Sequence, residues 1–163
     1  MPMLNGISEG SLVNELAQLS LIETARQTDA NLVLVKSTYE GSSSAENAKS
    51  FQHALASDAR WSEAAGFPYA GTYVGFSAIA ANMFARLETK WDNYRVDIED
   101  YVAQDDKVFA FGTYSGTYVK TDKYFSARVA HLWKIHSGEI VSFEQFVDSH
   151  TVVNAMQVQY VQR

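Results

Sequence analysis

The chain has 163 residues, of which 47% are hydrophobic, 20% charged and 13% aromatic, and its formal net charge is −6. This size and balance fit one globular domain with a sizeable core and exclude a disordered chain. The negative charge argues against nucleic acid or an anionic membrane surface as a partner, because both attract basic surfaces.

Several site types and targeting signals are absent from the sequence. The chain has no cysteine, so disulfides, thiolate nucleophiles and cysteine metal sites are excluded. No apolar run approaches the roughly 18 residues that span a bilayer, and the N-terminus lacks the basic region and apolar block of a secretory signal. We therefore expect no membrane partner and a cytoplasmic location.

Residues 1–28 are predicted to form an N-terminal extension to a single domain over 29–163. Leu12, Leu16 and Leu19 fall on one helical stripe, which predicts a short amphipathic helix. We expect this helix to pack on the body of the domain or on a second subunit rather than to recognise another partner.

The domain is predicted to begin with two helices. Asp29 is a candidate N-cap of a helix that ends at Gly41. After a serine-rich turn, a second helix presents Ala48, Phe51 and Leu55 at helical spacing.

A short strand is predicted next, at 59–63, followed by a glycine- and proline-containing loop and a third helix from Gly75. The apolar stripe of this helix consists of Phe76, Ile79, Ala80, Met83, Phe84 and Leu87. Met83 is expected to fill the core.

After Lys90 the hydrophobic period changes to two, which predicts strands. Tyr94, Val96, Ile98 and Val102 alternate with charged residues, and a second strand follows over about 107–119. The carboxylates of this region are scattered by the alternation and by a turn, so we expect a solvated surface there rather than a metal site.

Residues 124–150 are predicted to form two long strands joined by a turn at 136–139. We expect a bulged turn with Gly138 in the left-handed position; a two-residue loop would shift the register and move Gln145 away from His131. The bulged register places on one face Phe125, Ala127, Val129, His131, Trp133 and Ile135, beside Val141, Phe143, Gln145 and Val147. Arg128 and Glu144 are expected to pair across the strands on the opposite face.

This order of elements predicts an α+β fold in which a strongly curved antiparallel sheet wraps around the N-terminal helices. Such a cone leaves an interior space where a ligand can sit. The apolar face of the last two strands would form its wall, with one imidazole and one amide among apolar side chains.

The sequence resembles the nuclear transport factor 2-like superfamily, in its SnoaL-like and ketosteroid isomerase-like branch. The resemblance runs from about Leu32 to Ala155 and is carried by DARWSEAAGFPYAGTYVG, FGTYSGTYV and AHLWKIHSGEIVSFEQFVDS. It implies the cone-shaped, cystatin-like α+β fold and a homodimer through the outer face of the sheet. The superfamily includes isomerases, polyketide cyclases, epoxide hydrolases and proteins without catalytic activity.

The functional residues of the superfamily are only partly present at the matching positions of this chain. The isomerases place a carboxylate base after the first short strand, where this chain has Glu63. They also place a protonated aspartic acid before a strand histidine, where this chain has Ala130 before His131. Their tyrosine on the first helix has no convincing counterpart, since Tyr39 lies at the helix end. The cyclase aspartate of the last strand falls on Gln145.

The resulting candidate site combines two proton carriers with a set of ligand-binding residues. His131 and Glu63 are the candidate catalytic residues, and His131 is alternatively a core histidine bonded to Gln145 or to a tyrosine. The candidate ligand-binding residues are Trp61, Tyr69, Tyr73, Val129, Trp133, Phe143, Gln145 and Asp148, although Asp148 has a simpler interpretation as the cap of the last helix.

Two functions remain open from the sequence. One is acid/base catalysis of the isomerase, cyclase or hydrolase type on a small, hydrophobic, oxygenated molecule. The alternative is a non-catalytic module of the same fold that binds a ligand or a protein. No spacing suggests a metal triad, a phosphate loop or a Ser-His-Asp set, so we expect no metal and no cofactor.

Overall fold

The computed structural model describes residues 8–158. The helices are α1 (Glu9–Ser37), α2 (Ser44–Ala54), α3 (Gly75–Ile79), the π-helical η1 (Ala80–Phe84), α4 (Ala85–Lys90) and α5 (Ser149–Met156). The strands are β1 (Leu55–Glu63), β2 (Gly71–Val74), β3 (Trp91–Gln104), β4 (Lys107–Tyr118), β5 (Lys123–His136) and β6 (Glu139–Val147). The first seven residues of the predicted extension and the last five of the predicted domain lie outside the described residues.

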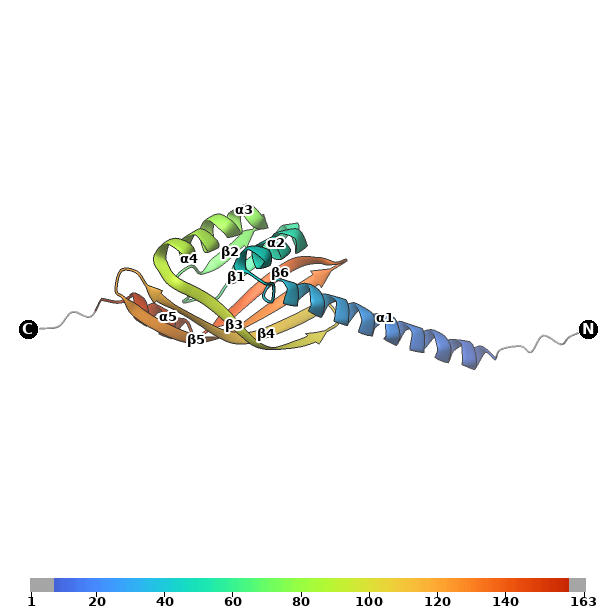
Figure 1. Cartoon of the computed structure of the whole chain (residues 1–163). Helices are drawn as coiled ribbons and strands as arrows, with labels where there is room; N and C mark the ends of the chain where they lie inside the picture. The colour runs from blue at the N-terminus through green and yellow to red at the C-terminus, as the bar shows by residue number, and fades with distance from the viewer. Residues whose placement is uncertain (1–7, 159–163) are drawn as a thin grey trace, which may run out of the picture.

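The six strands form one curved sheet in the order β2-β1-β6-β5-β4-β3. All neighbours are antiparallel except β1 and β6, which run parallel. Helices α2, α3 and α4 lie over one side of this sheet, while α1 projects away from it (Figure 1). This arrangement confirms the predicted cone-shaped α+β fold. The strand β2, which pairs with β1, was expected to be part of a loop.

Helix α1 is continuous, so the predicted helix start at Asp29 is wrong. Ser8 caps the helix by accepting a hydrogen bond from the backbone N–H of Ser11, 3.3 Å away. No glycine or proline occurs between residues 11 and 40 to interrupt it. The helix ends at Ser37, before the predicted stop at Gly41.

The apolar stripe near the start of α1 does not pack on the body of the domain. Leu12, Leu16 and Leu19 are 44%, 65% and 52% exposed. Contact with the sheet is made by the second half of the helix, where Asn31 and Val35 are buried. The predicted packing of this stripe on the body is therefore wrong for the single chain.

The third predicted helix begins at Gly75 but is not uniform. A Cβ at Gly75 would lie 2.8 Å from the carbonyl oxygen of Ser57, and its φ of +76° also favours glycine. Ile79 and Met83 are buried, as the stripe predicts, but η1 then changes the helical repeat and leaves Phe84 37% exposed. Met83 is thus core and Phe84 lies at the edge.

The turn between β5 and β6 corrects the predicted one. Ser137 and Gly138 both have positive φ, 50° and 79°, which is the two-residue type I′ turn. The register shifts where Ile135 pairs with Ile140, so that Val141 becomes the extra residue. Ile140 is consequently fully buried in place of Val141.

This shift preserves the pairing that the predicted bulged turn was meant to explain. His131 lies directly opposite Gln145, and Trp133 lies opposite Phe143. The irregularity therefore sits within β6 rather than in the turn itself.

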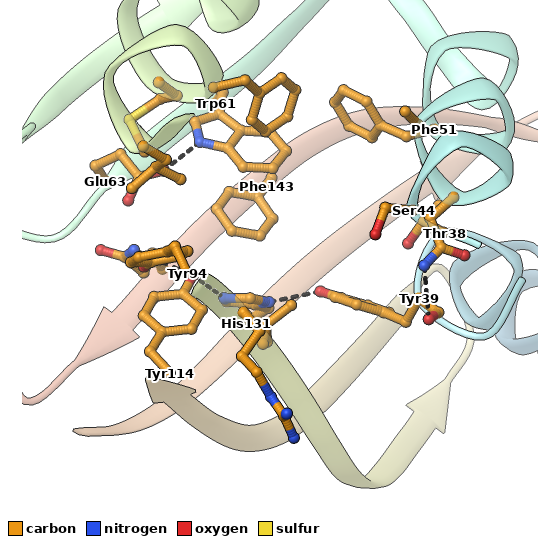
Figure 2. A pocket seen from close by; sticks show the side chains of 18 of the residues that line it. Thr38, Tyr39, Ser44, Phe51, Trp61, Glu63, Tyr94, Tyr114, His131 and Phe143 are labelled. Atoms are coloured by element: carbon orange, nitrogen blue, oxygen red, sulfur yellow. Dashed lines mark hydrogen bonds between the residues drawn. The ribbon is translucent and has the colours of Figure 1, made fainter. Parts of the chain in front are cut away.

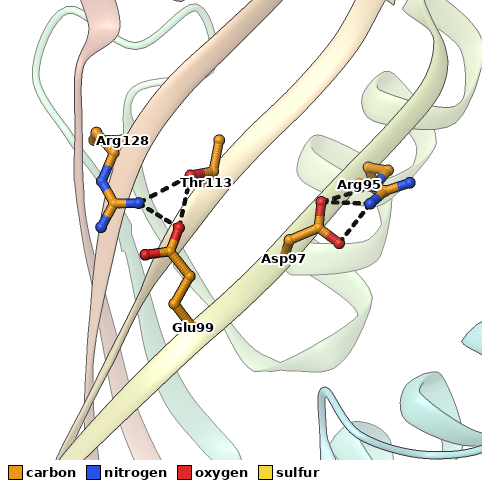
Figure 3. Close-up of polar contacts among 5 residues, drawn as sticks. All are labelled: Arg95, Asp97, Glu99, Thr113 and Arg128. Carbon is orange, nitrogen blue, oxygen red and sulfur yellow. Dashed lines mark hydrogen bonds and ion pairs between the residues drawn. The ribbon is translucent and has the colours of Figure 1, made fainter.

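The outer face of the sheet carries a polar cluster that differs from the expected pair. A register shift between Ile98 and Asp100 turns Val102 outward, where it is 57% exposed, so the predicted apolar alternation breaks at this residue. Arg128 donates to Glu99 and, at 3.0 Å, to Thr113 (Figure 3). This triad replaces the predicted pairing of Arg128 with Glu144.

Residues 8–158 contain neither a membrane-spanning helix nor a cluster of metal-binding side chains. Across these residues, every helix is too short or too polar to cross a bilayer. The same residues contain no group of three His, Cys, Asp or Glu side chains placed to hold a metal ion.

Candidate functional site

A pocket of about 370 Å³ lies between the helices and the inner face of the sheet (Figure 2). Helices α2, η1 and α4 line one side, and strands β1, β3, β4, β5 and β6 line the other. The lining residues are Thr38, Tyr39, Ser44, Asn47, Ala48, Phe51, Trp61, Glu63, Met83, Phe84, Leu87, Tyr94, Arg95, Val96, Tyr114, His131, Trp133, Phe143 and Gln145.

His131 lies in the middle of β5 and is bonded through both ring nitrogens. Its Nδ1 lies 2.5 Å from the hydroxyl of Tyr39, and its Nε2 lies 2.5 Å from the hydroxyl of Tyr114 (Figure 2). The side chain is buried, and this burial lowers the pKa of His131 from 6.5 to about 3. The imidazole is therefore neutral at physiological pH.

Each of the two tyrosine oxygens also accepts a hydrogen bond from a fixed donor. The indole N–H of Trp133 donates to Tyr39 at 2.9 Å. The amide nitrogen of Gln145 donates to Tyr114 at 3.3 Å, while its Oε1 accepts from the backbone N–H of Ala64 at 3.2 Å. The bond from Ala64 fixes which end of the Gln145 amide is the oxygen.

Glu63 ends β1 and turns its carboxyl group into the same pocket. Its Oε1 accepts a hydrogen bond from the indole N–H of Trp61. Its Oε2 is buried and has no hydrogen-bond partner in the part of the chain that the structure describes. Burial raises the pKa of Glu63 from 4.5 to about 7, and the Trp61 hydrogen bond offsets part of that rise.

Aromatic rings hold these polar groups in place and make most of the wall. Trp61 stacks on Phe143 with centroids 3.6 Å apart, and Trp133 meets both rings edge-on, at 5.8 and 4.8 Å. Phe51 of α2 closes the helical side against Trp61, 5.4 Å away. The pocket is therefore suited to an apolar ligand with few polar atoms.

One basic side chain also lines the pocket. Arg95 of β3 is largely exposed and forms a two-bond ion pair with Asp97, with both bonds 2.8 Å long (Figure 3). The charge of Arg95 is therefore paired with Asp97 at the surface and does not point into the interior of the pocket.

The structure brings together six of the ten predicted site residues. Trp61, Glu63, His131, Trp133, Phe143 and Gln145 all line the pocket. The other four lie outside its lining.

The four remaining residues have structural partners instead. Tyr69 accepts a hydrogen bond from Trp91 at 3.0 Å, and Tyr73 donates to the Tyr69 carbonyl at 2.7 Å. Val129 is buried in the core. Asp148 caps α5 by accepting from the Thr151 N–H at 3.1 Å, which is the simpler of its two predicted roles.

Sequence reasoning missed Tyr39 and Tyr114. Tyr39 has no predicted role because it lies at the end of the predicted helix, yet in the structure the turn after α1 carries its ring to His131. Tyr114 lies on the same face of β4 as Ala110, which pairs directly with His131. The alternation of β4 together with its register against β5 is the signal that could have found it.

Three solved structures show how this architecture occurs elsewhere. An NTF2-like protein from Burkholderia thailandensis E264 is 39% identical, with a TM-score of 0.74 over 78% of this chain and 98% of that one. TerC, crystallised with polyporic acid, is 19% identical, with a TM-score of 0.69 over 79% and 99%. A putative SnoaL-like polyketide cyclase from Jannaschia sp. CCS1 is 15% identical, with a TM-score of 0.68 over 82% and 96%.

The sequence itself identifies the family. No curated protein matches the chain. Residues 28–143 match the SnoaL-like domain, and this match covers the pocket residues from Thr38 to Phe143. The chain belongs to the family of SnoaL-like domains, within the NTF2-like fold.

Proposed function

We propose that this SnoaL-like domain binds a small, apolar, oxygen-bearing molecule in the pocket and exchanges a proton with it through Glu63. The observation that carries the proposal is the free Oε2 of Glu63, a buried carboxyl oxygen without a protein partner in the described residues. A buried carboxyl group with a pKa of about 7 is suited to general acid/base work near neutral pH.

The favoured reaction is removal of a proton from a carbon next to a carbonyl group. The C–H bond breaks, its proton passes to Glu63 Oε2, and its electron pair moves onto the carbonyl oxygen. Protonated Glu63 then returns the proton to the same or another carbon of the enolate. The negative oxygen needs a hydrogen-bond donor, and the hydroxyls of Tyr39 and Tyr114, which are held by His131, are the candidates.

Two further observations support this substrate class. The stacked rings of Trp61 and Phe143, with Trp133 edge-on beside them, offer apolar surface on the sheet side of the pocket. TerC, a protein of the same fold, was crystallised with polyporic acid, so this fold can hold an organic ligand, although the 19% identity supports only the shared fold.

A ketone of matching size tests the proposal. We would incubate the protein with 2-tetralone in D₂O and follow loss of its α-proton signals by NMR. Glu63→Gln should lower the exchange rate by about 10²-fold or more and leave the dissociation constant similar, because it removes the proton acceptor while keeping the shape. Glu144→Gln, on the exposed face of β6, is the matched control and should exchange as the wild type does.

The alternative is a binding module that performs no proton transfer. Ala130 and Gln145 favour it, because each stands where the family enzymes carry an aspartate. In that case 2-tetralone would bind, yet wild type and Glu63→Gln would exchange at the same slow rate. Failure of 2-tetralone and related bicyclic ketones to bind at all would contradict the ligand class in both versions.

We also propose that the domain forms a homodimer through the outer face of its sheet. Phe109 and Phe111 of β4 stack on each other there, with centroids 5.9 Å apart. Ala130 of β5 pairs with both Phe111 and Phe146, and Phe146 is 46% exposed. Together these side chains make an apolar patch of the kind that a second subunit covers.

Sedimentation velocity at micromolar concentration tests the dimer. The wild type should sediment as a dimer, and Phe146→Lys should sediment as a monomer because it places a charge in the patch. Val119→Lys, at a site 52% exposed beyond the end of β4, is the control and should remain dimeric. A monomeric wild type would contradict the proposal.

A further inference from the structure

His131, Tyr39 and Tyr114 form one hydrogen-bonded unit in which the two tyrosines contact opposite ring nitrogens. Both contacts are 2.5 Å long. Tyr39 and Tyr114 come from the turn after α1 and from β4, so three separate parts of the chain meet at one ring. Ring and hydroxyls all line the pocket (Figure 2).

The number of hydrogens in this unit is fixed. A neutral imidazole carries one N–H and has one nitrogen lone pair, and each tyrosine carries one O–H. The unit has three such hydrogens but only two ring-to-hydroxyl contacts, and each contact uses one hydrogen. One tyrosine O–H is therefore always left over.

No neighbouring group among the described residues accepts a hydrogen bond from that spare O–H. Trp133 and Gln145, which contact the tyrosine oxygens, do so as donors. Within the described residues neither hydroxyl has another acceptor in hydrogen-bond range. The spare O–H is thus available to a molecule in the pocket.

The ring tautomer determines which hydroxyl is spare. With the proton on Nδ1, the ring donates to Tyr39 and accepts from Tyr114, so the Tyr39 hydrogen is free. With the proton on Nε2, the directions reverse and the Tyr114 hydrogen is free. The two states differ only by moving hydrogens along one line of three groups.

We propose that Tyr39, His131 and Tyr114 act as a tautomer-controlled donor, which presents one tyrosine hydroxyl at a time to an acceptor oxygen of the ligand. His131 is then a positioning residue that relays hydrogen-bond direction and does not itself take the substrate proton. This inference deepens the proposed function and rests on it only for the ligand. It narrows that ligand to molecules with a carbonyl or phenolate oxygen at this end of the pocket.

The relay predicts opposite tautomers in two matched variants. In Tyr39→Phe the Nδ1 side has lost its acceptor, so the ring should carry its proton on Nε2 and donate to Tyr114. In Tyr114→Phe the proton should move to Nδ1 and point at Tyr39. Leaving a buried N–H without an acceptor is costly enough to favour each of these tautomers by about tenfold or more.

Two-bond ¹H–¹⁵N NMR correlation of ligand-free protein at pH 7 distinguishes these states. The pyrrole-type ¹⁵N shift of His131 should belong to Nε2 in Tyr39→Phe and to Nδ1 in Tyr114→Phe. The same tautomer in both variants would overturn the proposal. Because no ligand is present, this outcome is independent of whether Glu63 exchanges protons.

The wild type gives a second test that does not depend on the folding of either variant. Its His131 ring should be a neutral imidazole at pH 6, as expected for a relay of three neutral groups. An imidazolium signature there would overturn the proposal, because a ring with two N–H groups donates to both tyrosines and both hydroxyl hydrogens become spare.

Discussion

Glu63 on β1 and His131 on β5 line the same pocket, and burial shifts their pKa values in opposite directions. The pKa of Glu63 rises to about 7, and that of His131 falls to about 3. Both shifts favour the neutral form, because removal from water penalises charge. Near pH 6 the pocket thus contains two titratable groups that are both mainly uncharged.

The two shifts have opposite effects on stability. Between about pH 4.5 and 7 the folded protein keeps a proton on Glu63 that the unfolded chain has lost, so the free energy of unfolding falls as pH rises. Between about pH 3 and 6.5 the unfolded chain binds a proton at His131 that the folded protein does not, so the free energy of unfolding falls as pH drops. The two effects oppose each other from about pH 4.5 to 6.5.

In Glu63→Gln, the pH dependence of the free energy of unfolding should therefore show the effect of His131 without that of Glu63. The variant's free energy of unfolding should rise from pH 4.5 to 6.5 by on the order of 2–3 kcal/mol relative to the wild-type profile, because only the His131 contribution remains. Urea denaturation at several pH values measures this difference. Identical profiles for the two proteins would contradict the raised pKa of Glu63.

The same pKa predicts the pH dependence of catalysis. Proton abstraction requires ionised Glu63, so α-proton exchange of 2-tetralone should increase as pH rises and level off above about 7. A midpoint near the ordinary carboxyl pKa of 4.5 would indicate a different base. Glu63→Asp should keep a titration of the same direction at a lower rate, because the shorter side chain withdraws the carboxylate.

The pairing of His131 with Gln145 across the last hairpin could be predicted from sequence because the apolar alternation of both strands is strong. That alternation placed His131 beside Gln145 although the predicted turn was wrong. The extra residue at Val141 was not predictable in this way: Ile140 and Val141 are both apolar, and only packing decides which of them is buried.

The tyrosines of the pocket show the limit of the same reasoning. Periodicity assigns a face to Tyr114 within its own strand, but its distance from His131 depends on the register between two strands. Tyr39 follows the last turn of α1, so helical periodicity does not fix the position of its ring. Its position is determined by the way the helix docks on the sheet.

Two substitutions in the turn between β5 and β6 should change the free energy of unfolding in opposite directions. Gly138→Val should lower the free energy of unfolding by about 1 kcal/mol or more, because a branched side chain is strained at positive φ. Ser137→Asn should raise it by a few tenths of a kcal/mol, because Asn-Gly is the preferred pair in a type I′ turn. Chemical denaturation of both variants checks the pair, and destabilisation by Ser137→Asn would argue against the two-residue turn.

Gly112 should be the glycine of the sheet that is least tolerant of substitution. A Cβ on Gly112 would lie 2.1 Å from the carbonyl oxygen of Asp97 on the neighbouring strand β3, next to the register shift between Ile98 and Asp100. Gly112→Ala must displace backbone and should cost more than about 2 kcal/mol. Gly10→Ala, where a Cβ has nothing within 4 Å, is the control and should leave thermal stability unchanged or slightly raised. Similar stability of the two variants would contradict the close approach of β3 and β4.

Asn31 should anchor α1 to the sheet. Its Nδ2 donates to the Asp105 carbonyl at 2.8 Å, its Oδ1 accepts from Gln27 at 3.0 Å, and the side chain is buried. Asn31→Ala leaves the Asp105 carbonyl without this donor and should cost about 1–3 kcal/mol. Hydrogen exchange should also become faster at the second half of α1 and at the Asp105 amide, which donates to Thr28 at 3.1 Å. Asn14→Ala, on the exposed first half of the helix, is the control and should change neither stability nor exchange. Equal exchange in the two variants would show that α1 is held by its apolar contacts, such as those of Val35, rather than by Asn31.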